Sequence, residues 1–178
     1  MIIGNGAPKG WGSFINSFKY KNIDLLIEMQ YAYGNDILDM TSHTMVDRVG
    51  MDNSYREVLK AWTPENQNTM VPEIRNLNAG YVTNVDSYWV KDGSYLRGKN
   101  ILLGYTLPDF SIRNFKFQRF RIYGSAQNVF VISPLENFDP EVTVTNFGGD
   151  GNNVFSQGQN FFAYPRPTTF TIGLQAAF

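Results

Sequence analysis

Few residues of this chain could take part in chemistry. His43 is the only histidine and cysteine is absent, so neither a pair of imidazoles nor a thiolate is available to bind zinc or to attack a substrate. A Ser-His-Asp triad would have to use His43, and no nucleophile elbow accompanies it. We therefore expect His43 to be a surface residue of a loop, and we predict no catalytic residue, no metal site and no cofactor.

Two acidic segments also need to be considered. Asp24 and Glu28 lie four residues apart on a predicted strand, which places their carboxyl groups roughly 13 Å apart, too far to act on one glycosidic bond. We interpret them as solvated side chains. The run Asp150-Gly151-Asn152-Asn153 is similar to part of a calcium loop, but it lacks the bidentate glutamate at the required spacing. A flexible turn is the better interpretation of this run.

Aromatic side chains are the remaining candidates for ligand contact. Trp62, Tyr81, Tyr88 and Trp89 lie in or beside a long predicted connection, where they could stack on sugar rings. Packing within the connection explains them equally well, and the sequence leaves both interpretations open.

Composition excludes some classes of protein. The formal net charge of -1 over 178 residues provides no basic surface for nucleic acid. No run of about 18 apolar residues predicts a membrane-spanning helix, and Met1–Gly10 lacks the basic start and apolar core of a signal peptide. Aromatic residues make up 15% of the chain and charged residues only 17%, a combination that suits the aromatic girdles of a membrane barrel and also a carbohydrate-binding or sandwich fold.

The final stretch of the chain shows the strongest strand pattern. Phe170, Ile172, Leu174, Ala176 and Phe178 alternate with small or polar residues, which is the two-residue period of a strand. The apolar face would point inward in a soluble sandwich and outward to lipid in a membrane barrel. Eleven residues tilted by about 40° rise roughly 28 Å, close to the roughly 25 Å apolar band of an outer-membrane barrel.

The same alternation recurs along the chain. It predicts five strands, near 11–20, 23–34, 95–107, 119–131 and 168–178. The parity changes at Asn128-Val129-Phe130, which indicates a bulge. Long connections cover 35–94 and 132–167, and within the first of them we predict short helices near Ser54–Ala61, after a capping box, and near Ile37–Val49.

The connections alternate in length, with a tight turn at Lys21-Asn22 and then a long connection, and again a moderate one and a long one. Outer-membrane barrels show this alternation because their periplasmic turns are short and their external loops are long. We therefore predict an all-β fold, an antiparallel transmembrane β-barrel segment with long external loops that carry short helices.

Several short runs spread over nearly the whole chain form one pattern. They are the runs at 16–25, 30–37, 62–66, 92–97 (Asp-Gly-Ser-Tyr-Leu-Arg), 99–101, 103–105, 127–130 (Gln-Asn-Val-Phe), 139–141 (Asp-Pro-Glu) and 164–167 (Tyr-Pro-Arg-Pro). Each run is unspecific alone, but their order and intervals are jointly specific. In them the chain resembles the C-terminal barrel portion of SusC/RagA-type TonB-dependent outer-membrane transporters over nearly its whole length. Gly98 departs from the resemblance, because the family tends to carry a larger apolar residue there.

The resemblance implies a barrel of about 22 strands with a plug, located in the cell outer membrane and surrounded by its lipid. It implies import of glycans or peptides together with a SusD-like lipoprotein, driven through TonB. It also implies that the terminal strand, with Phe170, Ile172, Leu174 and Phe178, is the signal that the barrel-assembly machinery reads.

About five strands cannot close a barrel, and an open sheet leaves its edges unpaired. We therefore expect this chain to be a fragment that lacks the plug, the TonB-contacting part and the earlier strands, and that does not transport on its own. The alternative is a stand-alone soluble β-sheet module that binds carbohydrate.

Overall fold

The computed structural model describes residues 2–46, 53–74, 87–108, 110–112, 115–117, 119–141 and 158–177. Its strands are β1 (Gly10–Tyr20), β2 (Ile23–Tyr33), β3 (Asp36–Asp39), β4 (Val90–Asp92), β5 (Tyr95–Leu107), β6 (Phe110–Ile112), β7 (Phe115–Phe117), β8 (Arg119–Ile132), β9 (Gln159–Asn160) and β10 (Thr169–Ala177). Its helices are α1 (Met40–Val46) and the short 3-10 helices η1 (Arg56–Lys60) and η3 (Ser87–Trp89).

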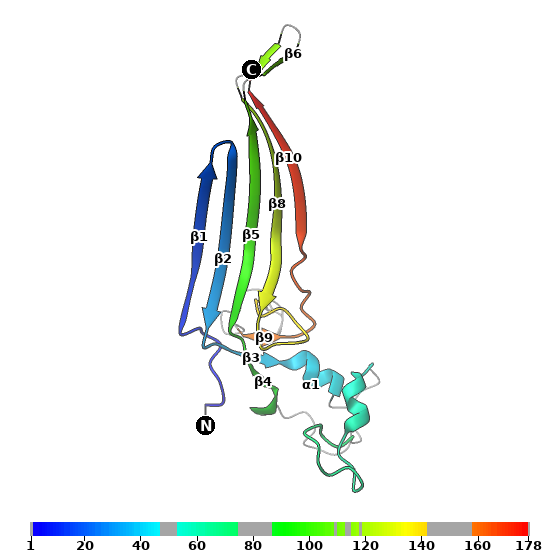
Figure 1. Ribbon diagram of the computed structural model, residues 1–178. Helices are drawn as coiled ribbons and strands as arrows, with labels where there is room; N and C mark the ends of the chain where they lie inside the picture. Colours follow the sequence, from blue (N-terminus) through cyan, green and yellow to red (C-terminus); the bar gives the residue numbers. More distant parts are fainter. Residues whose placement is uncertain are drawn as a thin grey trace, which may run out of the picture.

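The five long strands form one antiparallel sheet in the order β1-β2-β5-β8-β10 (Figure 1). They are the five strands predicted from the alternation, and each described end agrees with the prediction to within one residue. The tight Lys21-Asn22 turn and the β6–β7 hairpin lie at one end of the sheet, and the long connections lie at the other (Figure 1). This is the predicted alternation of connection lengths.

One face of the sheet is apolar. Neighbouring residues in one row across the strands are Phe18, Leu25, Leu103, Gly124 and Ile172. On β10 the side chains of Phe170, Ile172 and Leu174 are 77%, 85% and 67% exposed. A soluble sandwich would cover this face with a second layer, and none lies over it in the described part of the chain.

No helix among the described residues is long and apolar enough to cross a membrane.

The opposite face is polar, and an ion pair crosses it. Arg121 of β8 binds Asp24 of β2 through two contacts, Nε to Oδ1 at 3.0 Å and Nη2 to Oδ2 at 2.5 Å. Gly104 of β5 lies between them, and a Cβ at this position would come within 2.5 Å of Arg121 and 2.6 Å of Asp24. The absence of a side chain at Gly104 therefore leaves room for the pair, which we call the cross-strand ion pair.

Aromatic rings cover other glycines of the sheet. A Cβ at Gly173 would lie 2.2 Å from the Tyr123 ring, and one at Gly98 would lie 2.6 Å from the Phe130 ring. Such an arrangement protects the backbone at the glycine and adds cross-strand contact. The Phe130 ring thus occupies the space that a side chain at position 98 would need.

Two bulges occur side by side near one end of the sheet. Lys99 of β5 has no partner on β2, because Glu28 pairs with Asn100 and Met29 pairs with Gly98. On the other side of β5, the single Lys99 lies opposite two residues of β8, Asn128 and Val129. Asn128 has a φ of 51°. The predicted break in parity is therefore a bulge, and a matching irregularity in β5 accompanies it.

The long connections fold against each other into a small unit with its own core. β3 pairs with β4 and β9 in a second sheet. The buried residues Val46, Ala61, Val71 and Trp89 form the apolar core of this unit, which we call the loop core.

The two predicted helices are partly wrong. Ile37 and Asp39 are 1% and 3% exposed, so Asp36–Asp39 follows the two-residue period of a strand, and the helix begins only at Met40. The predicted helix near Ser54–Ala61 is a 3-10 helix of five residues without a side-chain cap. An α-helix over this stretch would place Leu59 on one packed face with Tyr55, Val58 and Trp62. Leu59 is instead 82% exposed, because a short 3-10 turn presents a narrower buried face than an α-helix.

Candidate functional site

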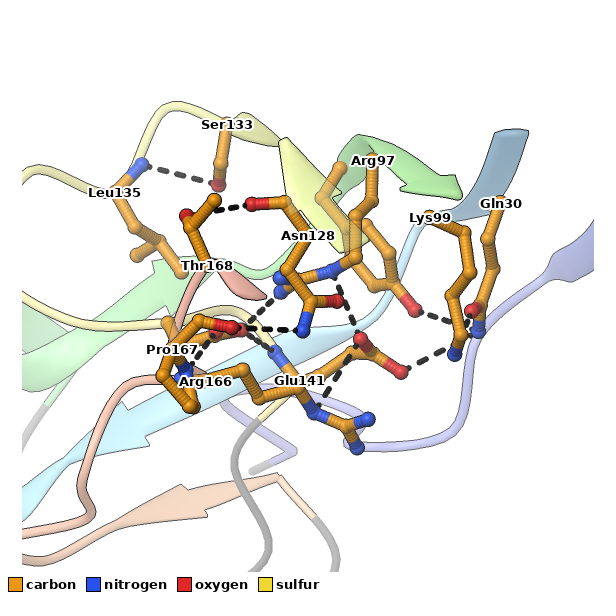
Figure 2. A network of polar contacts seen from close by, with 12 residues as sticks. Gln30, Arg97, Lys99, Asn128, Ser133, Leu135, Glu141, Arg166, Pro167 and Thr168 are labelled. Atoms are coloured by element: carbon orange, nitrogen blue, oxygen red, sulfur yellow. Dashed lines mark hydrogen bonds and ion pairs between the residues drawn. The ribbon is translucent and has the colours of Figure 1, made fainter. Parts of the chain in front are cut away.

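A buried ion network lies where the polar face of the sheet meets the long connections (Figure 2). Arg97 of β5 is 2% exposed and forms ion pairs with Asp139 and with Glu141, the latter at 2.9 Å from Nε to Oε2. Removing one partner from such a network leaves an uncompensated buried charge, which is strongly destabilising. Arg97 therefore ties the connection after β8 to the sheet.

Asp139 joins two segments that are distant in sequence. One of its carboxylate oxygens, Oδ1, accepts the backbone N–H of Glu141 at 2.9 Å, and the other, Oδ2, accepts the backbone N–H of Arg166 at 3.2 Å. The side chain of Arg166 in turn lies 3.6 Å from Glu141, from Nε to Oε2. One carboxylate, itself held by Arg97, thus holds the backbone of Glu141 and the backbone of Arg166 together.

The network extends onto β2 through Gln30. Its Nε2 donates to Glu141 Oε1 and to the Tyr95 hydroxyl, both at 3.3 Å, and its Oε1 accepts from Lys99 Nζ at 2.7 Å. Lys99 reaches this face together with Arg97 and Asn100 because it is the extra residue of the β5 bulge. The bulge therefore concentrates polar side chains that strict alternation would send to opposite faces.

A second set of contacts fixes the entry to β10. Asn128 Nδ2 donates to the Pro167 carbonyl at 3.0 Å, and Thr168 Oγ1 donates to the Asn128 carbonyl at 2.9 Å (Figure 2). The β8 bulge is thus the anchor of the segment that carries Arg166.

A cavity of about 600 Å³ adjoins the network. Gln30, Tyr95, Glu141 and Arg166 line it, and so does Trp11, whose ring is 76% exposed. An aromatic platform beside a few oriented polar groups suits the binding of a small ligand or of one unit of a polymer. None of the residues that line it in the described part of the chain is a serine, threonine, cysteine or histidine.

The turn between β4 and β5 is the other ordered polar feature of this end. Ser94 N and Oγ donate to Asp92 Oδ1 at 2.9 Å and 2.5 Å. Gly34 N donates to Ser94 Oγ at 3.0 Å, and Gly93 N donates to the Asn35 carbonyl at 2.8 Å. The hydrogen bonds from Ser94 lower the pKa of Asp92 below its ordinary value of 3.8. The turn fixes the start of β5, and with it the position of Arg97.

The predicted ligand-contacting aromatics are not gathered at the cavity. Trp89 is 4% exposed in the loop core and meets His43 edge to face at 5.3 Å, so packing is the better interpretation of Trp89. Tyr88 contacts Trp89 and carries Lys91 over its ring at 4.6 Å, and Trp62 is 37% exposed. Tyr81 lies outside the described residues.

The structure also describes some of the remaining residues that the sequence analysis singled out. His43 is 9% exposed and belongs to α1, so the expected surface loop position is wrong. Asp24 pairs with Arg121, on the same face as Glu28. Phe178 and the run 150–153 lie outside the described residues.

Sequence reasoning did not single out Arg97, Asp139, Glu141 or Trp11 as site residues. The first three stand inside the stretches that carry the family resemblance. Trp11 shares the parity of Ser13, the polar parity of β1, and this was the signal available for it.

The amino-acid sequence is similar to those of known TonB-dependent receptors. No protein-family model matches the chain. TonB-dependent receptor P3 of Formosa agariphila is 34% identical over 177 residues, which are 99% of this chain and 17% of that receptor. TonB-dependent receptor SusC of Bacteroides thetaiotaomicron is 26% identical over 168 residues, 92% of this chain and 14% of SusC. These relatives are named as receptors.

The fold comparison agrees. A chain of the RagAB peptide importer in its closed-closed state matches with a TM-score of 0.77 and 25% identity, over 99% of this chain and 18% of that chain. The open-open state matches with a TM-score of 0.75 over 97% of this chain. The chain thus spans less than a fifth of the length of the relatives and structures described here.

A two-faced antiparallel sheet, with short connections at one end and long ones at the other, defines a portion of an outer-membrane β-barrel. Within that class the chain corresponds to the C-terminal barrel portion of the SusC/RagA-type TonB-dependent transporters.

Proposed function

We propose that this chain forms five adjacent strands of an outer-membrane transporter that imports oligomeric nutrients, either glycans or peptides, together with a SusD-like surface lipoprotein. The observation that carries the proposal is the two-faced sheet. Its apolar face is exposed, its polar face carries an ordered ion network, and the whole sheet matches a chain of the RagAB importer.

The sheet edges support a role within a larger barrel. β1 and β10 each pair with one neighbour in the described part of the chain. An exposed strand edge in a bilayer costs several kcal/mol for each unsatisfied backbone group. The remaining strands of the barrel satisfy these edges in our proposal, and the chain by itself is a single barrel segment that does not transport.

The remaining functions belong to other parts of the transporter in this proposal. A plug closes the barrel and another segment contacts TonB. Phe178, Phe170, Ile172 and Leu174 serve as the assembly signal, while outer-membrane lipid covers the apolar face.

The test is fractionation of cells that express the full-length transporter with an affinity tag. We expect the tagged protein in the outer-membrane fraction, copurification of a surface lipoprotein in detergent, and loss of uptake of one class of oligomeric nutrient when the gene is deleted. A monodisperse protein in the soluble fraction, without detergent, would contradict the proposal and favour the stand-alone soluble module.

A further inference from the structure

We propose that the cavity beside the ion network is a subsite for an acidic sugar, in which Trp11 stacks on the ring and Arg166 pairs with the carboxylate. This inference rests on the proposed function, because it names the class of substrate that the transporter would carry. The sequence and the comparisons assign no ligand to this cavity.

The position of Trp11 is the first argument. Trp11 pairs with Ala32 on the polar face of the sheet, and within the described part of the chain it is 76% exposed beside the small side chain of Ala32. A large aromatic surface that faces water costs free energy until something covers it. The flat apolar face of a pyranose ring is a suitable cover, because stacking buries the ring and leaves its hydroxyl groups free.

The charge of Arg166 is the second argument. Its side chain is 47% exposed, and its ion pair with Glu141 is long at 3.6 Å. Glu141 lies closer to Arg97, at 2.9 Å, so the single carboxylate is shared between two guanidinium groups. The charged residues that line the cavity are Arg166 and Glu141. Because Glu141 also binds Arg97, it compensates the charge of Arg166 only in part.

The rigidity of the site is the third argument. Asp139 holds the backbone of Arg166, and prolines stand on both sides of it at 165 and 167. Asp139 is itself 7% exposed and is fixed by the buried Arg97. A guanidinium on a fixed backbone loses little freedom when it binds a carboxylate in a forked geometry.

The remaining lining groups select the type of ligand. Glu141 accepts hydrogen bonds only, while Gln30 and the Tyr95 hydroxyl both donate and accept. These groups suit several hydroxyls next to one carboxylate. A uronic acid unit carries a ring face, hydroxyls and a carboxylate, and therefore matches the whole cavity, whereas an acidic peptide matches only its charge.

The experiment uses the full-length transporter in detergent and measures binding by isothermal titration. The probes are linear trigalacturonate, neutral maltotriose and the tripeptide triglutamate. We expect trigalacturonate to bind more tightly than either control probe. The substitutions Arg166→Gln and Trp11→Ala should each weaken trigalacturonate binding about tenfold or more, since a charged hydrogen bond or a stacked ring contributes at least about 1.4 kcal/mol.

A control substitution outside the cavity and a check of folding accompany the binding measurement. Arg119→Gln removes the same residue type as Arg166→Gln but outside the cavity, and it should leave trigalacturonate binding unchanged. Each variant is first checked for the heat-modifiable mobility of a folded barrel. Equal binding of maltotriose, tighter binding of triglutamate, no binding of trigalacturonate, or unchanged binding by the two cavity variants would overturn the inference. If outer-membrane location and lipoprotein copurification persist in that case, only the subsite is wrong and the proposed function stands.

Discussion

Replacing Ile172 by arginine tests whether the apolar face meets lipid. Ile172 is 85% exposed and stands one residue from Gly173, the centre of the nine-residue strand β10. Nine residues tilted by about 40° rise roughly 23 Å, nearly the full apolar band, so Ile172 lies close to the bilayer midplane. An arginine on the lipid face at this depth costs about 2 to 4 kcal/mol.

This free energy corresponds to a decrease of roughly 30- to 900-fold in the equilibrium constant for folding. The matched control is Thr171→Arg, at almost the same depth on the polar face, where Thr171 pairs with Ser125. We expect the control to change the free energy of unfolding by less than about 1 kcal/mol, because its charge remains in the hydrated interior.

The assay refolds the full-length transporter into lipid vesicles across a urea series and measures the fraction with the mobility of a folded barrel on an unheated gel. The reasoning is refuted if Ile172→Arg is as stable as the parent, or if Thr171→Arg costs as much. Either result would mean that the two faces of β10 do not meet different solvents.

Three further substitutions test the interior and the connections. Gly104→Ala should displace the cross-strand ion pair, so that its coupling energy in a double-mutant cycle falls from about 1 kcal/mol to near zero; a coupling that persists would contradict the steric argument. Trp89→Ala should destabilise the loop core by about 3 to 5 kcal/mol and speed trypsin cleavage of the connections while the barrel stays folded, whereas the exposed Leu59→Ala should not. The Asp92 carboxylate, whose folded pKa lies below its unfolded value of 3.8, stabilises its turn above about pH 4 and loses this effect as the pH falls through the folded pKa. The protection of the Ser94 amide against hydrogen exchange should decline in that range. Asp92→Asn should remove this pH dependence. A Ser94 amide that is unprotected at every pH in the parent protein would refute the hydrogen bond.

The strands could be predicted from the sequence because the residues on one face of each strand are mainly apolar and those on the other face are mainly polar or small. Along β10, the difference between Ile172 and Thr171 is repeated at every step, and a shift of one residue would exchange the two faces. The register was therefore determined locally. The break at Asn128 was visible for the same reason, since a bulge is a change of parity.

The ion network could not be predicted because it depends on contacts across the chain. Gln30 and Glu141 lie 111 residues apart, and Arg97 and Asp139 lie 42 apart. Strict alternation along β5 would place Arg97 on the apolar parity of Ile101 and Leu103, and only the bulge at Lys99 brings it to the face of Gln30. Nothing in the pattern of a loop indicates which carboxylate it brings to that face. The short helices failed for a related reason, because the loop core and not local propensity decides where Ile37 and Leu59 lie.

The paired bulges limit how these strands can change in length. Lys99 is surplus with respect to β2, and the pair Asn128-Val129 is surplus by one with respect to Lys99. Deleting Lys99 alone would restore regular pairing between β2 and β5, but it would increase the mismatch between β5 and β8. A descendant that loses Lys99 must therefore also lose a residue of β8 to keep the second mismatch at one residue, so a shortening of β5 at this point is tied to a shortening of β8.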